Sequence, residues 1–233
     1  MRIGAISAPG VLARWFRVRC PICGIGAVDP VVCAGCSADF LDADKHRCTR
    51  CAIPLPGSAS VCGACLHRPP HFDATVTLAD YATPIDGLVL ALKFGHRLDL
   101  APVLGALLAE RLRPFTEPDV LFVPVPLSFE RLAERGFNQA LEIARAAAWP
   151  LNARVEANAV VRVRHAAPQA TLSLDARKRN IRGAFVVRRD VQRQALIVVD
   201  DVMTSGSTLD ELARVLKAAG AARVTNLVVA RTP

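Results

Sequence analysis

The sequence predicts an α/β protein whose mostly parallel sheet is flanked by helices and preceded by a small cysteine-rich domain. All eight cysteines lie in the first 65 of 233 residues, in pairs of one spacing. Beyond residue 70, stretches typical of strands alternate with stretches of helical periodicity, which indicates a parallel sheet covered on both faces. A pair of adjacent aspartates beside a loop of small residues then marks a candidate site in this second domain.

The cysteines form four CxxC pairs: Cys20 and Cys23, Cys33 and Cys36, Cys48 and Cys51, Cys62 and Cys65. Two thiolates at this spacing chelate one ion from a tight knuckle, and two knuckles complete a tetrahedral sulfur site. We therefore expect two structural Zn²⁺ ions. A disulfide scaffold or a redox CxxC pair fits four identical pairs less well, and an iron–sulfur cluster is the other alternative.

Sequential pairing would place the first four cysteines on one ion and the last four on the other, and we favour it over interleaved pairing. Roughly 70 residues with few large apolar side chains need such a staple to fold. The cysteines stop before Pro69 and Pro70. We predict a double zinc-ribbon domain over 1–70 and a second domain over 71–233.

In the second domain, strand-favouring residues predict a strand over 74–81, and a helical spacing of apolar residues follows Pro84. A second helix is predicted over 101–112. The apolar run 120–125, which ends at prolines, predicts a buried strand, and 132–148 predicts one long helix. A continuous apolar strand over 195–199, a helix over 209–219 that ends at Gly220, and a strand over 224–229 complete the pattern.

The stretch VVDDVMTSGSTL begins at Val198 and holds the candidate site. In open α/β folds ligands bind at the carboxyl ends of strands, where Asp200 and Asp201 stand. The following small residues lead into a helix, whose backbone N–H groups and hydroxyls would form an anion cradle. Carboxylates repel phosphate but suit sugar hydroxyls or a divalent cation. A ligand with a phosphate and a vicinal diol, such as ribose 5-phosphate, would satisfy both halves.

This stretch resembles the phosphoribosyl pyrophosphate (PRPP) motif of type I phosphoribosyltransferases. The resemblance implies a type I phosphoribosyltransferase-like fold, with Asp200 and Asp201 on the ribose hydroxyls, 203–208 around the 5′-phosphate, and Mg²⁺ bound with PRPP. The PRPP-binding residues would be Lys93, Val199, Asp200, Asp201, Val202, Met203, Thr204, Ser205, Gly206, Ser207 and Thr208.

Further motifs narrow the resemblance: Val123-Pro-Val-Pro126, Arg135-Gly-Phe-Asn-Gln139, Pro168-Gln169, Arg177-Lys-Arg-Asn180, Gly183-Ala-Phe185 and Leu92-Lys-Phe94. With the four CxxC knuckles, they make nearly the whole chain resemble the ComF family, double zinc-ribbon and phosphoribosyltransferase-like proteins linked to DNA uptake in competent bacteria. The resemblance implies work on single-stranded DNA after uptake, with the competence machinery and a helicase-type protein as partners.

A phosphoribosyltransferase must neutralise the departing pyrophosphate, and Arg135 and Lys178 are the cations that we place with the two aspartates as catalytic residues. The loop after Val125 matches the pyrophosphate loop of type I enzymes, and the segment 162–182 matches their mobile catalytic loop. Each has a plainer interpretation. Arg135 and Asn138 would only brace a helix, Lys93 would be a solvated helix residue, and Arg177, Lys178, Arg179 and Arg182 would bind nucleic acid.

The net charge of +8 and the pI of about 9.4 favour a polyanionic partner, although a generally basic proteome gives the same values. Ten Lys and Arg face three acids between Arg154 and Arg193. No apolar run approaches the roughly 20 residues that span a bilayer, and no signal-peptide cleavage site is evident, so we expect a cytoplasmic protein.

Two classes of function follow. The first is a PRPP- and Mg²⁺-dependent phosphoribosyltransferase that acts in competence and single-stranded DNA handling. The second is a non-catalytic PRPP-sensing module that binds nucleic acid, and a nucleobase-salvage phosphoribosyltransferase is a further alternative. Only 5% of the residues are aromatic, which limits base stacking. The sequence does not specify an acceptor.

Overall fold

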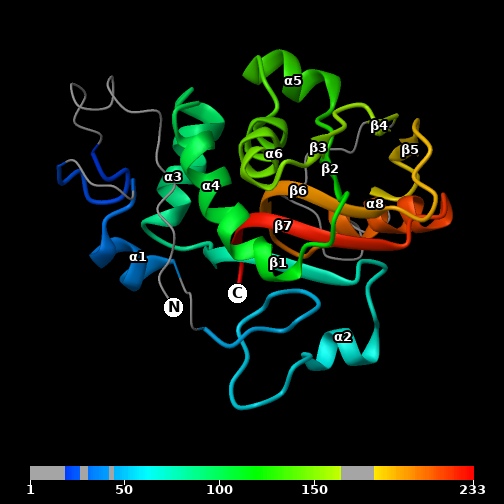
Figure 1. Ribbon diagram of the computed structural model, residues 1–233, viewed down its shortest axis with the longest axis horizontal. Coiled ribbons are helices and arrows are strands. Elements are labelled where there is room, and N and C mark those ends of the chain that lie inside the picture. Colours follow the sequence, from blue (N-terminus) through cyan, green and yellow to red (C-terminus); the bar gives the residue numbers. More distant parts are fainter. Residues whose placement is uncertain (1–18, 27–30, 42–44, 164–180) are drawn as a thin grey trace.

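The computed structural model describes residues 19–26, 31–41, 45–163 and 181–233. These residues form a five-stranded, all-parallel sheet with the order β1-β7-β6-β2-β3, and a separate antiparallel pair, β4-β5 (Figure 1). The strands are β1 (Ala74–Asp80), β2 (Leu121–Pro124), β3 (Arg154–Val155), β4 (Val160–Arg162), β5 (Phe185–Val187), β6 (Ala195–Met203) and β7 (Arg223–Arg231). The predicted α/β class with a mostly parallel sheet is confirmed.

Both faces of the sheet are buried, because successive residues of a strand point to opposite sides. In β6, Ile197 and Val199 join one apolar cluster while Leu196 and Val198 join the other. Helices α3, α4 and α6 cover the first face, and α8 covers part of the second (Figure 1). Their bounds are α3 (Ile85–Phe94), α4 (Leu100–Leu112), α6 (Gln139–Ala148) and α8 (Ser207–Ala218), with short 3₁₀ turns η1 (Arg113–Phe115) and η2 (Trp149–Leu151).

The two ribbons pack on opposite faces of this sheet. The first contains α1 (Ala34–Phe40), and its buried residues join the cluster of α3 and α4. The second contains α2 (Gly63–His67), and three of its cysteines share a cluster with α8. Figure 1 shows α1 beside α3 and α2 on the other side of β1. None of the described helices is both long and apolar enough to cross a bilayer.

The predicted single helix over 132–148 is wrong, because the chain forms α5 (Phe129–Arg135), a break and then α6. Gly136 ends α5 with a φ of 76°, in the left-handed region that favours glycine. Asn138 then caps α6 by accepting a hydrogen bond from the Ala140 N–H at 3.0 Å. Apolar residues continue across the break, and that continuity concealed it in the sequence.

The strand predicted over 195–199 is longer than expected, since β6 continues to Met203. Asp200 pairs with Val228 of β7, and Val202 pairs with Ala230. The two aspartates therefore lie inside the last part of a strand and point to opposite faces of the sheet.

Candidate functional site

Asp201 lies on the face of the sheet that α3 covers. Its Oδ2 is 2.9 Å from Lys93 Nζ, and only 10% of the Asp201 side chain and 19% of the Lys93 side chain are exposed. Lys93 is therefore not a solvated helix residue. The Lys93 ammonium group therefore lies beside Asp200 and Asp201, and its positive charge partly balances their two carboxylates.

Asp200 has the most strongly perturbed carboxyl of the site. Burial raises its pKa to about 7, the neighbouring Asp201 carboxylate adds to the rise, and Lys93 and Arg131 oppose it. Its Oδ1 accepts a hydrogen bond from the Asp201 N–H at 2.9 Å. A carboxyl near half ionisation at neutral pH can accept hydrogen bonds from hydroxyls and gains from any cation that approaches it.

The loop after β6 forms a small concave cradle that ends at the N-terminus of α8. A cavity of about 30 Å³ lies between Asp200 and this loop and is lined by Asp200 and 202–209. Gly206 has a φ of 76°, and a Cβ there would lie 2.5 Å from Met203 Cε. The positive φ favours glycine, and any larger residue would also require the end of the Met203 side chain to move. The first N–H groups of α8 and the Ser205 and Ser207 hydroxyls surround a space suited to an anion.

A second cavity of about 270 Å³ adjoins the cradle. Four cationic side chains line it: Lys93 from α3, Arg131 and Arg135 from α5, and Arg162 from β4. Asp200, Thr204 and Thr208 line both cavities, so the two cavities form one continuous site. Burial lowers the pKa of Arg162, and nearby Arg131 adds to this effect, which shows how densely the cations are gathered.

The motif Arg135-Gly-Phe-Asn-Gln139 builds one wall of this cavity. Asn138 Nδ2 donates to the Val125 carbonyl at 3.0 Å, so the loop after β2 is braced against α6. Arg135 Nη1 donates to Gln139 Oε1 at 3.1 Å, and its guanidinium stacks over Phe94 at 4.9 Å. Within the described residues, Arg135 Nε and Gln139 Nε2 are buried donors without a partner. The motif thus braces the helix and also lines the cavity.

Met203 differs from the rest of the predicted PRPP-binding set. Met203 is 2% exposed, and its side chain packs close to Gly206. Val199 is fully buried in the sheet. Asp200, Asp201, Val202, Lys93 and 204–208 line one or both cavities.

Three predicted residues, Arg177, Lys178 and Arg179, lie outside the described residues. Arg182 is described and exposed, and it does not line either cavity. Sequence reasoning did not assign Gln139 or Tyr81 to the site and named Arg162 only as the start of the predicted catalytic loop, although all three line the larger cavity. Gln139 belonged to a recognised motif, whereas no local pattern distinguished Tyr81.

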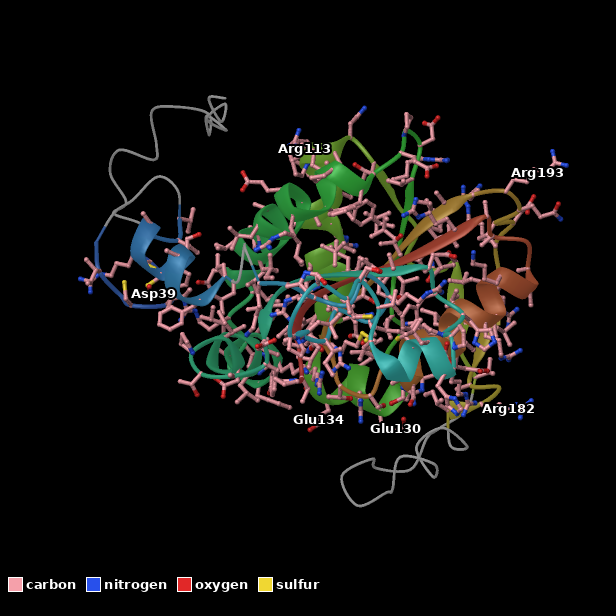
Figure 2. All side chains as sticks on the ribbon, turned by 90° about the horizontal axis from the view of Figure 1, so that it is seen from below. Asp39, Arg113, Glu130, Glu134, Arg182 and Arg193 are labelled. Carbon is pink, nitrogen blue, oxygen red and sulfur yellow. The ribbon has the colours of Figure 1, made fainter. Side chains whose placement is uncertain are left out.

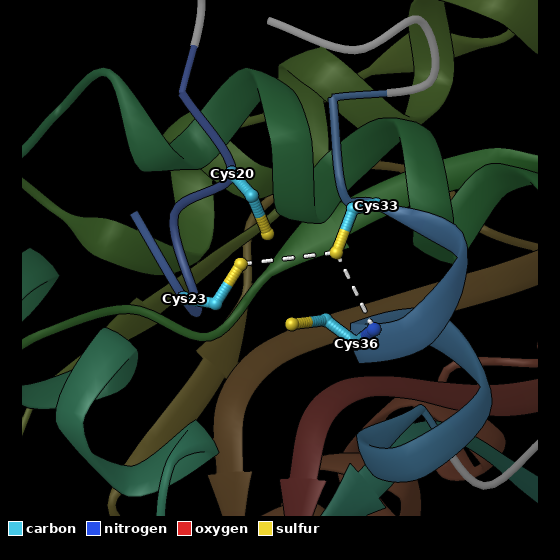
Figure 3. A group of neighbouring side chains, drawn as sticks. All are labelled: Cys20, Cys23, Cys33 and Cys36. Atoms are coloured by element: carbon cyan, nitrogen blue, oxygen red, sulfur yellow. Dashed lines mark hydrogen bonds between the residues drawn. The ribbon is translucent and has the colours of Figure 1, made fainter. Parts of the chain in front are cut away.

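The cysteines form two groups of four, and within each group the sulfur atoms lie within 4.8 Å of one another. Figure 3 shows the first group, Cys20, Cys23, Cys33 and Cys36, converging on one point. A tetrahedral zinc site with Zn–S bonds of about 2.3 Å separates its sulfurs by about 3.8 Å. The Cys23–Cys33 and Cys51–Cys62 sulfur distances are 3.8 and 3.7 Å. The sequential pairing is confirmed, and both groups fit structural zinc.

Backbone hydrogen bonds favour the thiolate form of the first cysteine in each ribbon. Burial alone would raise the pKa of Cys20, but hydrogen bonds from the backbone at Cys23, Cys33 and Ile22 lower it to about 6. The same balance lowers the pKa of Cys48 to about 7. Burial instead raises the pKa of Cys36, Cys51 and Cys65. Thiolates are the form that binds zinc, so the backbone favours the ligand form at Cys20 and Cys48.

Comparison with known proteins agrees with this architecture. Residues 11–66 match the double zinc ribbon domain, and residues 136–233 match the phosphoribosyl transferase domain. DNA utilization protein YhgH of Escherichia coli K12 is 38% identical over 207 residues, which cover 86% of this chain and 90% of that protein. Competence protein F of Haemophilus influenzae is 30% identical over 220 residues, 90% of this chain and 95% of that protein.

The chain belongs to the ComF family. A solved hypoxanthine phosphoribosyltransferase from Staphylococcus aureus, 11% identical, aligns with 58% of this chain and 63% of that chain at a TM-score of 0.35. That likeness is weak, so the fold assignment of this ComF-family chain rests on the domain match and the strand order.

Proposed function

We propose that this ComF-family protein binds PRPP with Mg²⁺ and transfers the phosphoribosyl group to an acceptor during single-stranded DNA handling. The observation that supports this most is the continuity of the two cavities through Asp200, Thr204 and Thr208. One end is an anion cradle, the middle carries carboxylates, and the other end is lined by four cations. PRPP has the matching order of groups, namely phosphate, diol and pyrophosphate.

On this proposal each part of the site acts on a stated group. The cradle 204–208 binds the 5′-phosphate, and Asp200 and Asp201 accept hydrogen bonds from the ribose hydroxyls. In the reaction the bond from C1 to the pyrophosphate oxygen breaks, pyrophosphate leaves with the bonding electrons, and the acceptor bonds to C1 and loses a proton. Lys93, Arg131, Arg135 and Arg162 stabilise the charge that develops on the leaving group. Mg²⁺ would share that charge near Asp200, as an oxygen ligand suits this ion.

Ligand-induced stabilisation tests the binding proposal. Millimolar PRPP with Mg²⁺ should raise the melting temperature, because a ligand that binds only the folded state stabilises it. The double variant Asp200→Asn, Asp201→Asn should lose this rise, and the exposed Asp190→Asn should keep it. Binding retained by the double variant would exclude both acids from the site.

A screen for pyrophosphate release from PRPP across nucleobases, nucleotides and single-stranded DNA tests catalysis and identifies the acceptor. Release with single-stranded DNA or a nucleotide supports the proposed role. Release only with a nucleobase would favour a salvage enzyme, and binding without release would favour a PRPP-sensing module.

Nucleic-acid binding has separate support in exposed arginines around β5, in keeping with relatives named for competence and DNA utilization. Arg182, Arg188 and Arg193 are exposed, although Arg193 lies well away from Arg182 (Figure 2).

On this proposal the protein works in the cytoplasm beside a helicase-type partner, with its ribbons in 1–70 and its transferase domain in 71–233. Affinity for single-stranded DNA should fall steeply with salt, and a flat salt response would contradict a phosphate-binding surface.

A further inference from the structure

Arg231, the last residue of β7, joins two segments that lie far apart in the sequence. Its Nε donates to the Cys51 carbonyl at 2.9 Å, and its Nη1 donates to the Met203 carbonyl at 3.3 Å. Nη1 also donates to the Thr232 carbonyl. Arg231 is only 7% exposed, so these hydrogen bonds form where water competes little.

One end of this bridge belongs to the second zinc site. Cys51 is a ligand of that site, and the turn around it is closed by the Ala52 N–H, which donates to the Cys48 carbonyl at 2.8 Å. Zinc bound to Cys48 and Cys51 would hold this turn in one shape. The direction of the Cys51 carbonyl is therefore set by the knuckle.

The other end belongs to the phosphate cradle. Met203 is the last residue of β6, and the cradle begins at the next residue. Its Cε lies 2.5 Å from the position that a Cβ of Gly206 would take, and its sulfur accepts a hydrogen bond from the Thr75 hydroxyl at 3.9 Å. Because the loop starts at the next residue, a shift of the Met203 backbone would move the start of the cradle.

We propose that Arg231 is a positioning residue through which the second zinc ribbon sets the geometry of the phosphate cradle. A planar guanidinium donates in two fixed directions at once, so it can hold the Cys51 and Met203 carbonyls at a set separation. The identity of the anion in the cradle rests on the proposed function. The position of the loop itself does not, and it can be measured without ligand.

The experiment uses the full chain and three variants. Arg231→Met removes the bridge, Arg231→Lys keeps the charge without the planar fork, and Arg47→Gln weakens a different anchor of the same ribbon. Arg47 bonds to Asp80 at 2.8 Å and to the Ala52 carbonyl at 2.9 Å, so it ties the ribbon to the end of β1. Hydrogen exchange of the amides 204–207, PRPP affinity by calorimetry and zinc content are measured for each.

In Arg231→Met, exchange of the cradle amides should rise and PRPP affinity should fall about tenfold, since bonds from a charged donor are lost, while zinc stays at two ions. Arg231→Lys should restore part of the affinity but leave exchange raised, because an ammonium group cannot hold both carbonyls in the same way. Arg47→Gln should match the wild type in both. If Arg231→Met fails to fold, Arg231→Lys carries the test.

If the cradle amides of Arg231→Met exchange at the wild-type rate, the proposal is overturned. Full recovery of exchange and affinity in Arg231→Lys would overturn it too, because the charge of Arg231 alone would then explain its role. An equal rise in exchange for Arg47→Gln would also overturn it, since any loosening of the ribbon would then suffice. If the wild type binds no PRPP, the proposed function fails, and the exchange data still decide whether Arg231 positions the cradle.

Discussion

The two zinc ribbons have the same ligand set but join the rest of the protein differently. In the first, Cys20 and Cys36 are buried against the cluster of α3 and α4, while Cys23 is exposed. In the second, Cys48, Cys51 and Cys65 share a cluster with Met203 and α8, next to the candidate site. The second ribbon also bonds to the ends of β1 and β7 through Arg47 and Arg231.

The difference follows from how the sheet is covered. A parallel sheet needs both faces buried. Helices α3, α4 and α6 cover one face, whereas in the described chain the other face is covered by α8, the β4–β5 pair and the second ribbon. The second ribbon therefore acts as part of the sheet's packing and lies against the strands that carry the site. The first ribbon adds to a face that the helices already cover.

Loss of one zinc ligand in each ribbon should give the largest contrast. Cys65→Ser and Cys36→Ser are matched, because both remove a buried ligand from a short helix, α2 or α1. Each should reduce the zinc content from two ions to about one, from the four thiolates that each ion requires. Only Cys65→Ser should abolish the PRPP-induced rise in melting temperature, because only that ribbon supports the cradle.

Metal analysis and thermal unfolding with and without PRPP and Mg²⁺ measure this contrast. Loss of the PRPP effect in both variants would mean that the first ribbon also supports the site. Its retention in both would separate the second ribbon from the site altogether.

A smaller contrast is expected between two truncated core side chains. Met203→Ala and Leu41→Ala should each lower the free energy of unfolding by about 2–5 kcal/mol, since both side chains are buried. Met203→Ala should also weaken PRPP binding, because it empties the space beneath Gly206. Leu41→Ala, in the first ribbon, should leave the affinity unchanged. Denaturant unfolding and calorimetry give the two quantities, and equal loss of affinity would contradict the distinction.

The sequence predicted the parts of the molecule that repeat a local pattern. The CxxC spacing identified both zinc sites, strand-favouring residues identified β1, and apolar runs identified β2, β6 and β7. The acid pair and the small residues after it marked the cradle, because strand, turn and helix follow one another directly there. The break between α5 and α6 was missed, since a left-handed glycine and a cap interrupted an apolar pattern that otherwise continued.

Contacts between distant segments could not be predicted in this way. Nothing near Arg231 indicates a partner 180 positions away at Cys51. Likewise, the Lys93–Asp201 pair depends on α3 packing against β7 beside β6, which only the folded sheet determines. The ribbons show this limit clearly, because their ligand patterns are identical and their roles differ only through packing.

Asp80, at the end of β1, and Asp200, in the site, should affect stability with opposite dependence on pH. For Asp80, burial raises the pKa but the bonds from Lys45 and Arg47 outweigh it, so the pKa lies below 3.8 and the carboxylate stabilises the fold at neutral pH. For Asp200 the pKa is raised to about 7, chiefly by burial. Its ionisation is therefore easier in the unfolded chain, and stability is lost as the pH rises from about 4 to 7.

Asp80→Asn should lower the free energy of unfolding by about 1–2 kcal/mol across about pH 5–8, because a charged hydrogen-bond acceptor is lost. Asp200→Asn should instead raise it by on the order of 1–2 kcal/mol at pH 8, with the gain shrinking toward pH 5. Urea unfolding of the ligand-free protein at several pH values measures both. A gain in Asp200→Asn that does not depend on pH would contradict the raised pKa.

The smallest effect is expected where the linker after the second ribbon meets α8. His71 donates from its backbone N–H to Asp210 Oδ1 at 2.7 Å, and its Nδ1 lies 3.0 Å from the same oxygen. Both side chains are exposed, and exposed pairs contribute about 0.2–1 kcal/mol at most. Asp210→Asn should therefore change the melting temperature by no more than about 2 °C, with less change at high salt. PRPP affinity should stay at the wild-type value, since this contact holds the linker and does not reach Met203. A large loss of affinity would show that the second ribbon acts on the cradle through α8, and the contrast with Arg231→Met would disappear.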